Sequence, residues 1–387
     1  MYDTVRRCET DRTVEGISPT FMKIAMDISI MEECRTGTEE YTEGLVWGLH
    51  RIGTQILGIG HQGRALLPDR SCLGLTPRPK RSPWHKWWWE TFGIMSGPQD
   101  ISLVHIPYMM HPPKAFRVPS VVTVHDLIPY RLQAYHGRLK EKLYFSQVRK
   151  YLPLATQIVA ISQATYHDIA DIFPKWVPKV TVIPNGVHPD YFRPVAVEQM
   201  EKLISRYHLT RRPRLLYVGG YDARKNVRTL LEACQRVFSR LKDGELVLVG
   251  GLHHESTVRF VEELDLTDRV ILTPFLSRSV VVALYQAADL FVYPSTYEGF
   301  GLPPAQALAM GVPVIAGDTS AVSEVVEDSG LLVPPSDVSA WSDTIMKVVQ
   351  TPALAQKMAA RGRARAEDFS WENIAAQYLK LYQRIVQ

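Results

Sequence analysis

The fold of this chain is constrained most by a regular alternation of short apolar runs and longer amphipathic runs, which begins at Met22. The apolar runs are rich in Val, Ile and Leu, a composition typical of strands that are buried on both faces of a sheet. The longer runs between them repeat apolar residues at helical spacing. Strands that alternate with helices in this way predict parallel sheets covered by helices, which is an α/β fold.

The predicted strands fall into two sets of six. The first set covers residues 23–28, 55–59, 102–106, 121–125, 158–161 and 180–183. The second covers residues 215–219, 246–250, 270–273, 290–293, 314–316 and 331–333. Helices are predicted over residues 39–51, 141–151, 163–172, 227–240, 279–287 and 371–385. Because 387 residues are too many for one ordinary core, the two sets predict two domains.

The domain boundary is predicted between residues 185 and 214. Asn185-Gly186 is a turn signal, and Arg211-Arg212-Pro213 precedes the first strand of the second set. We therefore assign residues 22–190 to the first domain and residues 191–370 to the second. Residues 1–21 are polar, without periodicity and too hydrophilic for a signal peptide, and they are predicted to be a disordered extension.

Composition narrows the class of protein. The chain is 46% apolar and 22% charged, as in ordinary globular proteins, and no apolar run approaches the ~18 residues that span a bilayer. Its net charge of +4 permits contact with an anionic membrane surface but does not argue for it, and no nucleic acid is expected as a partner. Cys8, Cys34, Cys72 and Cys234 are too scattered for a zinc site or a disulfide framework, which fits a cytoplasmic protein.

Residues 293–314, YPSTYEGFGLPPAQALAMGVPV, predict a binding site for a phosphate. The stretch reads as a strand end, a turn with Glu298, Gly299 and Gly301, and then a helix opened by Pro303 and Pro304. Proline is tolerated in a first helical turn because its missing N–H would have no partner there. A glycine loop that leads into a helix N-terminus offers backbone donors and a positive dipole end, which suit a sugar phosphate.

A second anion site is predicted after the first strand of the second domain. Arg224-Lys225-Asn226 follows the glycine pair Gly219-Gly220 and opens a helix. Cations are unfavourable at a helix N-terminus, so a bound pyrophosphate is a better explanation than a solvated pair at a helix start.

Two further candidates lie in the first domain. His125 ends a predicted strand, where ligands of open α/β sheets collect, although a lone histidine there is otherwise structural. Gly37 lies between the first strand and the helix after it, a second cradle for phosphate. The residues that follow, Glu39 and Glu40, cap a helix start well but would repel a diphosphate at close range.

The stretch EGFGLPPAQALAMGVPV is similar to the Glu-x7-Glu signature of retaining glycosyltransferases of the GT-B fold, family 4. The first glutamate of that signature falls on Glu298, and the second falls on Gln306. Further matches occur in the same order: VTVHDLIP, VAISQAT, VIPNGV, YVGGYDARKN and LLVPPSD. The resemblance covers nearly all of the chain after Met22.

The resemblance implies two Rossmann-like domains that face each other across a cleft, with the helix over residues 371–387 crossing back to complete the first. It implies a hexosyltransferase that uses a nucleotide sugar, GDP-mannose before UDP-glucose, and a glycan or lipid-linked acceptor in polysaccharide or glycolipid assembly. Retention of configuration would proceed by same-face attack within an ion pair. Arg224 and Lys225 would stabilise the leaving diphosphate, Glu298 would hold sugar hydroxyls and His125 would line the sugar face. The donor-binding residues implied are Gly37, Gly219, Gly220, Arg224, Lys225, Glu298, Gly299, Phe300, Gly301, Leu302 and Gln306.

Gln306 departs from the family pattern, in which a glutamate accepts hydrogen bonds from the ribose. Glutamine keeps an acceptor oxygen but loses the charge, at a cost of about 1 kcal/mol, or several-fold in donor affinity. The alternative is a non-catalytic homologue that binds a nucleotide sugar or a glycan in a degraded site.

The remaining motifs give weaker indications of function. Residues 58–63 match G-x-G-x-x-G, but Pro68 follows too soon for the required helix, which argues against a dehydrogenase. His253-His254-Glu255 is interpreted as a polar loop. Because the chain also lacks an Asp-x-Asp triplet, neither a metal nor another cofactor is expected.

Two aromatic and basic stretches leave a membrane contact open. Residues 84–89 hold four tryptophans, which could form a membrane-interface patch, a sugar-stacking platform or a helix packed on the first domain. Residues 140–150 are basic and amphipathic, as in a solvated helix face or a lipid-binding one. If either stretch binds lipid, the protein is expected at the inner face of the membrane.

Overall fold

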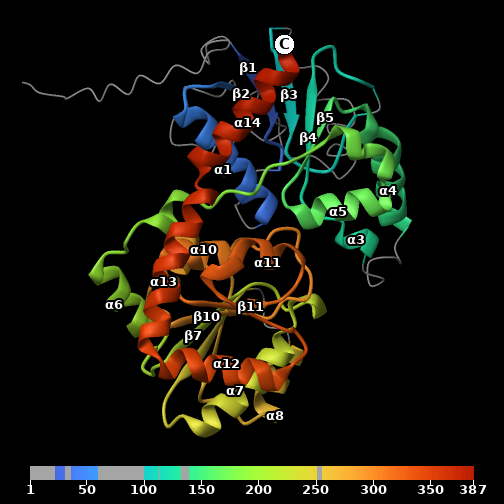
Figure 1. The fold of residues 1–387 in the computed structure, drawn as a ribbon. Coiled ribbons are helices and arrows are strands. Elements are labelled where there is room, and N and C mark those ends of the chain that lie inside the picture. The colour runs from blue at the N-terminus through green and yellow to red at the C-terminus, as the bar shows by residue number, and fades with distance from the viewer. Residues whose placement is uncertain (1–21, 31–35, 60–99, 113, 132–138, 251–254) are drawn as a thin grey trace, which may run out of the picture.

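The computed structural model describes residues 22–30, 36–59, 100–112, 114–131, 139–250 and 255–387, with side chains left out at 139–144 and 320. The predictions for residues 1–21, for the tryptophan-rich residues 84–89, for most of the G-x-G-x-x-G motif and for His253 and His254 lie outside this part of the chain. Glu255, the last residue of that predicted polar loop, begins a helix. The described chain forms two lobes, each built on a sheet flanked by helices (Figure 1).

The first sheet has six strands, all parallel, in the order β2-β1-β3-β4-β5-β6 within the described residues. Its strands are β1 Lys23–Asp27, β2 Gln55–Ile59, β3 Leu103–Ile106, β4 Ser120–Val124, β5 Gln157–Ala160 and β6 Val180–Val182. Met26 lies opposite both Gly58 and His105, which places β1 between β2 and β3. All of β4 is buried, as its run of β-branched residues predicts.

The second sheet is also parallel and six-stranded, in the order β12-β11-β10-β7-β8-β9. Its strands are β7 Arg214–Val218, β8 Glu245–Val249, β9 Val270–Thr273, β10 Leu290–Tyr293, β11 Val314–Gly317 and β12 Leu331–Val333. The strand order reverses between β7 and β10, as in dinucleotide-binding domains, and ligands of such sheets bind beyond the carboxyl ends of the strands at that point. The predicted α/β fold of two Rossmann-like domains is confirmed.

Helices cover both sheets. Their bounds are α1 Gly37–Arg51, α3 Ile128–Arg131, α4 Leu139–Tyr151, α5 Gln163–Ile172, α6 Val197–Arg206, α7 Val227–Arg240, α8 Glu255–Glu263, α9 Arg278–Ala287, α10 Leu302–Met310, α11 Ser320–Val326, α12 Val338–Gln350, α13 Pro352–Ala366 and α14 Trp371–Val386. The predicted basic stretch over residues 140–150 falls within α4. Helix α6 was not predicted; its apolar face, with Leu203 buried, covers the second lobe inside a segment that we interpreted only as a boundary.

The last helix returns to the first lobe (Figure 1). Trp371, the first residue of α14, packs so closely on α1 that a Cβ on Gly44 would lie 2.0 Å from its indole ring, and one on Gly48 would lie 2.5 Å from its backbone oxygen. Farther along α14, the hydroxyl of Tyr378 lies 2.5 Å from that of Tyr41, and the hydroxyl of Tyr382 lies 2.5 Å from Nδ1 of His105. These buried hydrogen bonds attach α14 to α1 and to β3 of the first lobe.

Two segments connect the lobes and lie side by side. Val187, which follows the first sheet, pairs with Ser370, which precedes α14, in an isolated parallel bridge. The backbone N–H of Val187 donates to the carbonyl oxygen of Phe369 at 2.8 Å. The two connecting segments are therefore hydrogen-bonded to each other between the lobes.

Candidate active site

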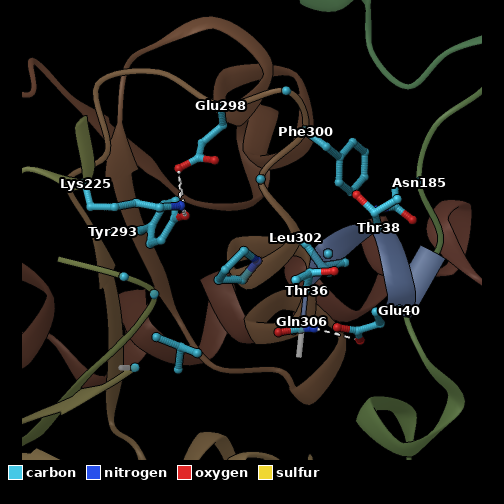
Figure 2. A pocket seen from close by; sticks show the side chains of 18 of the residues that line it. Thr36, Thr38, Glu40, Asn185, Lys225, Tyr293, Glu298, Phe300, Leu302 and Gln306 are labelled. Carbon is cyan, nitrogen blue, oxygen red and sulfur yellow. Dashed lines mark hydrogen bonds and ion pairs between the residues drawn. The ribbon is translucent and has the colours of Figure 1, made fainter. Parts of the chain in front are cut away.

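A cleft of about 490 Å³ lies between the two lobes, beyond the carboxyl ends of β4, β7 and β10. The start of α1 and the start of α10 form two of its walls (Figure 2). Every residue predicted for the site lines this cleft: Gly37, His125, Gly219, Gly220, Arg224, Lys225, Glu298, Gly299, Phe300, Gly301, Leu302 and Gln306. The structure thus brings together loops that are far apart in the sequence.

Glu298 is the centre of a buried charged cluster at one end of the cleft. Its Oε1 accepts from Lys225 Nζ at 2.6 Å, and its Oε2 lies 2.9 Å from Arg224 Nη1. The hydroxyls of Ser295 and Tyr293 also donate to Oε1, at 2.6 and 2.9 Å. Burial alone would raise the pKa of Glu298, but the charges of Lys225 and Arg224 outweigh it and hold the pKa below its ordinary value. Glu298 is therefore a carboxylate held rigidly between two cations.

Both cations keep hydrogen-bond donors for a ligand. Lys225 Nζ donates to Glu298 and, at 2.7 Å, to the hydroxyl of Tyr293, so the third proton of the ammonium group has no partner within the described chain. Arg224 Nη1 donates to the carbonyl oxygen of Tyr297 and pairs with Glu298. Its Nε lies 3.1 Å from Asp222 without forming a hydrogen bond, and Nη2 has no partner among the same residues. An anion that lies beside both side chains could accept from each without displacing Glu298.

Glycines in the cleft walls allow neighbouring backbone segments to approach each other closely. Gly301 is the N-cap of α10 and has a φ of 105°, a conformation that favours glycine. Because Pro303 and Pro304 have no N–H, the backbone donors at this helix end come from Gly301 and Leu302. At the carboxyl ends of β7 and β8, a Cβ on Gly250, where φ is 137°, would lie 2.0 Å from the carbonyl oxygen of Gly219.

His125 faces the cleft as a neutral imidazole. Its Nε2 lies 2.8 Å from the carbonyl oxygen of Pro107, an acceptor, so the proton is on Nε2 and Nδ1 carries the lone pair. Burial lowers the pKa of His125 to about 4, despite that hydrogen bond. The ring of Tyr41 meets it edge-on, with the ring centroids 4.8 Å apart. The imidazole is thereby fixed in one orientation.

Gln306 lies at the other end of the cleft from the charged cluster (Figure 2). Its amide Nε2 donates to Glu40 Oε1 at 3.0 Å, and its Oε1 accepts from the hydroxyl of Tyr285 at 3.2 Å. Glu39 and Glu40 were both predicted to repel a diphosphate at close range. Glu40 makes the contact with Gln306, whereas Glu39 points away from it. Its carboxylate accepts from the backbone N–H of Thr36, which completes the cap of α1, a helix that begins at Gly37 rather than at the predicted Glu39.

Several residues of the cleft were missed or misinterpreted from sequence. Asn185, interpreted only as a turn signal, lines the cleft with its side chain 96% buried (4% exposed), and its Oδ1 has no hydrogen-bond partner in the described chain. Arg278, the first residue of α9, binds Glu43 of α1 across the cleft and lies 2.9 Å from Nε2 of His188. The only signal for Arg278 was its place at a predicted helix start. No three His, Cys, Asp or Glu side chains of the described residues gather into a metal-binding group.

Comparison with known proteins agrees with this architecture. The family model for glycosyl transferases group 1 matches residues 200–365, and the model for glycosyltransferase family 4 matches residues 35–191. O-antigen chain mannosyltransferase B of Escherichia coli is 31% identical over 284 residues, which are 71% of this chain and 74% of that protein. MMP alpha-(1->4)-mannosyltransferase of Mycolicibacterium hassiacum is 31% identical over 236 residues, 59% of this chain and only 54% of that protein.

Solved structures share the whole fold. Sucrose-phosphate synthase from Thermosynechococcus elongatus superposes with a TM-score of 0.71 at 23% identity, over 94% of this chain and 98% of that one. HepE of Anabaena, solved in complex with UDP and glucose, superposes with a TM-score of 0.74 at 18% identity, over 94% of this chain and all of that one (100%).

Two parallel sheets facing each other across a cleft that is lined from both lobes make this the GT-B architecture of glycosyltransferases. With the family models and the mannosyltransferase relative, the chain belongs to glycosyltransferase family 4, as its signature sequences predicted. None of the helices in the described part of the chain is both long and apolar enough to cross a membrane.

Proposed function

We propose that this protein transfers a hexose from a nucleotide sugar, GDP-mannose before UDP-glucose, to a glycan or lipid-linked glycan, with retention of configuration. The observation that carries the proposal is the pair of cations, Arg224 and Lys225, whose unused donors line the cleft beside Glu298. The E. coli relative, an O-antigen chain mannosyltransferase, supports mannose as the sugar and polysaccharide assembly as the process. The complex of HepE with UDP supports a nucleoside diphosphate as the leaving group.

In the proposed reaction the bond between the anomeric carbon and the diphosphate oxygen breaks, and the acceptor oxygen bonds to the anomeric carbon on the face that the diphosphate leaves. The proton of the acceptor hydroxyl passes to the departing diphosphate oxygen. Arg224 and Lys225 stabilise the negative charge that grows on the diphosphate, and the positive end of the α10 dipole contributes to this. Glu298, which these cations keep ionised, accepts hydrogen bonds from sugar hydroxyls. His125 is neutral and orients the sugar rather than protonating it. None of these roles uses a metal.

The charge on Lys225 is tested by Lys225→Ala. Turnover should fall at least tenfold, or about 1.4 kcal/mol, because the developing charge on the diphosphate loses one of its two cations. Arg228→Ala is the matched control, since it removes an exposed cation from the same helix start and lies outside the cleft. Melting curves of both variants would show that they fold. Unchanged turnover in folded Lys225→Ala would remove Lys225 from the mechanism.

The donor is tested by a thermal-shift screen with GDP, UDP, ADP and their hexose conjugates. A diphosphate present at about one hundred times its dissociation constant should stabilise the fold by about 2.7 kcal/mol. The nucleotide that stabilises most identifies the donor class, and transfer or slow hydrolysis of its hexose conjugate then supports the enzyme. Binding without either reaction would favour the non-catalytic sugar-nucleotide binder instead.

A further inference from the structure

A carboxylate from the first lobe enters the cleft at the end away from the charged cluster. Glu40 lies in the first turn of α1 and reaches Gln306 of α10, which belongs to the second lobe (Figure 2). The two residues are 266 positions apart in the sequence, and each lines the cleft. Oε1 of Glu40 accepts the amide proton of Gln306, whereas Oε2 has no partner within the described part of the chain.

The local structure fixes both members of this pair. Glu39 is committed to the cap of α1, because it exchanges hydrogen bonds with Thr36. The next residue, Glu40, is rotated by about 100° around the helix and so faces the cleft. On the other lobe, the Tyr285 hydroxyl donates to Oε1 of Gln306, which leaves the Nε2 end of the amide to face Glu40.

Burial brings the pKa of Glu40 close to neutral pH, and its charged neighbours adjust it. Burial raises the pKa of Glu40 from 4.5 to about 7; Arg278 lowers it, Glu43 raises it further, and the amide of Gln306 lowers it. Among the described residues, the phenols of Tyr191 and Tyr285 also interact with this carboxyl. A ligand hydroxyl that donates to Glu40 would favour the ionised carboxylate. Oε2, which has no partner in the described chain, would then accept that hydrogen bond.

We propose that Glu40 is the carboxylate that binds the ribose hydroxyls of the nucleotide, and that Gln306 positions it from the opposite lobe. The inference rests on the proposed function, because it assumes a nucleoside diphosphate in the cleft. A carboxylate is the usual partner of ribose hydroxyls in sheets of this kind. It also repels phosphate, so Glu40 at one end and the cations Arg224 and Lys225 at the other orient the nucleotide along the cleft.

The contact with the ribose is tested by comparing GDP and UDP with their 2′-deoxy forms in titration calorimetry. The wild-type protein should bind the ribose form about tenfold more tightly, since a hydroxyl bound to a charged acceptor is lost in the deoxy form. Glu40→Gln should abolish this preference. The double variant Glu40→Gln with Gln306→Glu returns a carboxylate to the pair from the other lobe and should restore it. Glu39→Gln is the control, because glutamine also completes a helix cap at that position.

The outcomes separate the inference from the proposed function. A preference for ribose that survives Glu40→Gln overturns the inference, and so does an equal loss of both forms, which would indicate a structural role. Loss of the preference in Glu40→Gln alone, with recovery in the double variant and no change in Glu39→Gln, supports it. If neither diphosphate binds to the wild-type protein, the proposed function fails first and this inference falls with it.

Discussion

At the scale of single residues, the carboxyl groups and cations of the site have partners within the chain before a ligand binds. Glu298 is paired with Lys225 and Arg224, and Glu40 is hydrogen-bonded to Gln306. The first group was predictable, because its members lie in two short motifs whose glycines and cations indicate phosphate binding. The second was not, because nothing in the sequence around Glu40 indicates a partner 266 residues away. Glu40 and Gln306 become neighbours when the two lobes pack together.

The raised pKa of Glu40, about 7, predicts a dependence of stability on pH. Between about pH 4.5 and pH 7 the folded protein keeps a proton on Glu40 that the unfolded chain releases, so the wild-type protein loses stability as the pH rises through that window. Glu40→Gln has no proton to lose there. In urea denaturation at several pH values, the free energy of unfolding of Glu40→Gln should therefore rise relative to that of the wild type up to about pH 7. Above that pH the difference should stay constant.

Glu198→Gln is the matched control for this titration, since it removes an exposed carboxylate from α6. It should follow the wild type at every pH. A stability difference between Glu40→Gln and the wild type that stays constant with pH would contradict the proposed protonation of Glu40.

At the scale of elements, the strands and the helices α1, α4, α5, α7, α9 and α14 followed from periodicity, and the arrangement of the strands did not. The predicted strands all occur, within a residue or so of their ends, because Val- and Ile-rich runs fit a doubly buried sheet whatever their neighbours. Helix α6 escaped prediction because the search for a domain boundary, guided by turn signals, treated its segment as irregular. The order of the strands reverses beside the cleft in each sheet. It depends on how the connections between strands pack, which the local sequence does not indicate.

The contact between α1 and α14 gives a prediction about packing. Gly48→Ala would place a Cβ 2.5 Å from the backbone oxygen of Trp371, so it should destabilise the protein by about 1–3 kcal/mol. Gly37→Ala, on the same helix, meets nothing within 4 Å and should change the stability by less than about 0.5 kcal/mol. Denaturation in urea measures both. Equal stability of the two variants would show that the helices separate to accept the methyl group.

At the scale of the whole molecule, the lobes touch through the loop that carries Glu298. A Cβ on Gly299 would lie 2.0 Å from the backbone oxygen of His125, and the hydroxyl of Ser162 donates to the carbonyl oxygen of Gly299 at 2.7 Å. Nearby, Glu324 of α11 accepts from the backbone N–H groups of Gln163 and Ala164 at 2.8 and 2.6 Å, at the start of α5. The described structure is thus a closed arrangement of the two lobes, stabilised by polar contacts across the cleft.

This closure makes Gly299→Ala a probe of motion between the lobes. The added methyl group cannot fit against His125, so the variant should populate an open arrangement, with a larger radius of gyration in small-angle scattering and weaker nucleotide binding. Each lobe should keep its own helices and sheet, visible in circular dichroism. Gly220→Ala is the control for the radius of gyration, because its Cβ would meet only Asp222, at 3.4 Å. A radius of gyration equal to that of the wild type in Gly299→Ala would contradict this account of closure.

The return of α14 to the first lobe also sets the order in which the protein can be finished during synthesis. Tyr41 and His105 are translated early, yet their partners Tyr378 and Tyr382 are made only after the entire second lobe. Nascent domains usually fold from the N-terminus onward. Here the second lobe can be complete on the ribosome while the first still exposes the surface of α1 that Trp371 will cover. For a chain of this design, the half that is made first is the half that matures last.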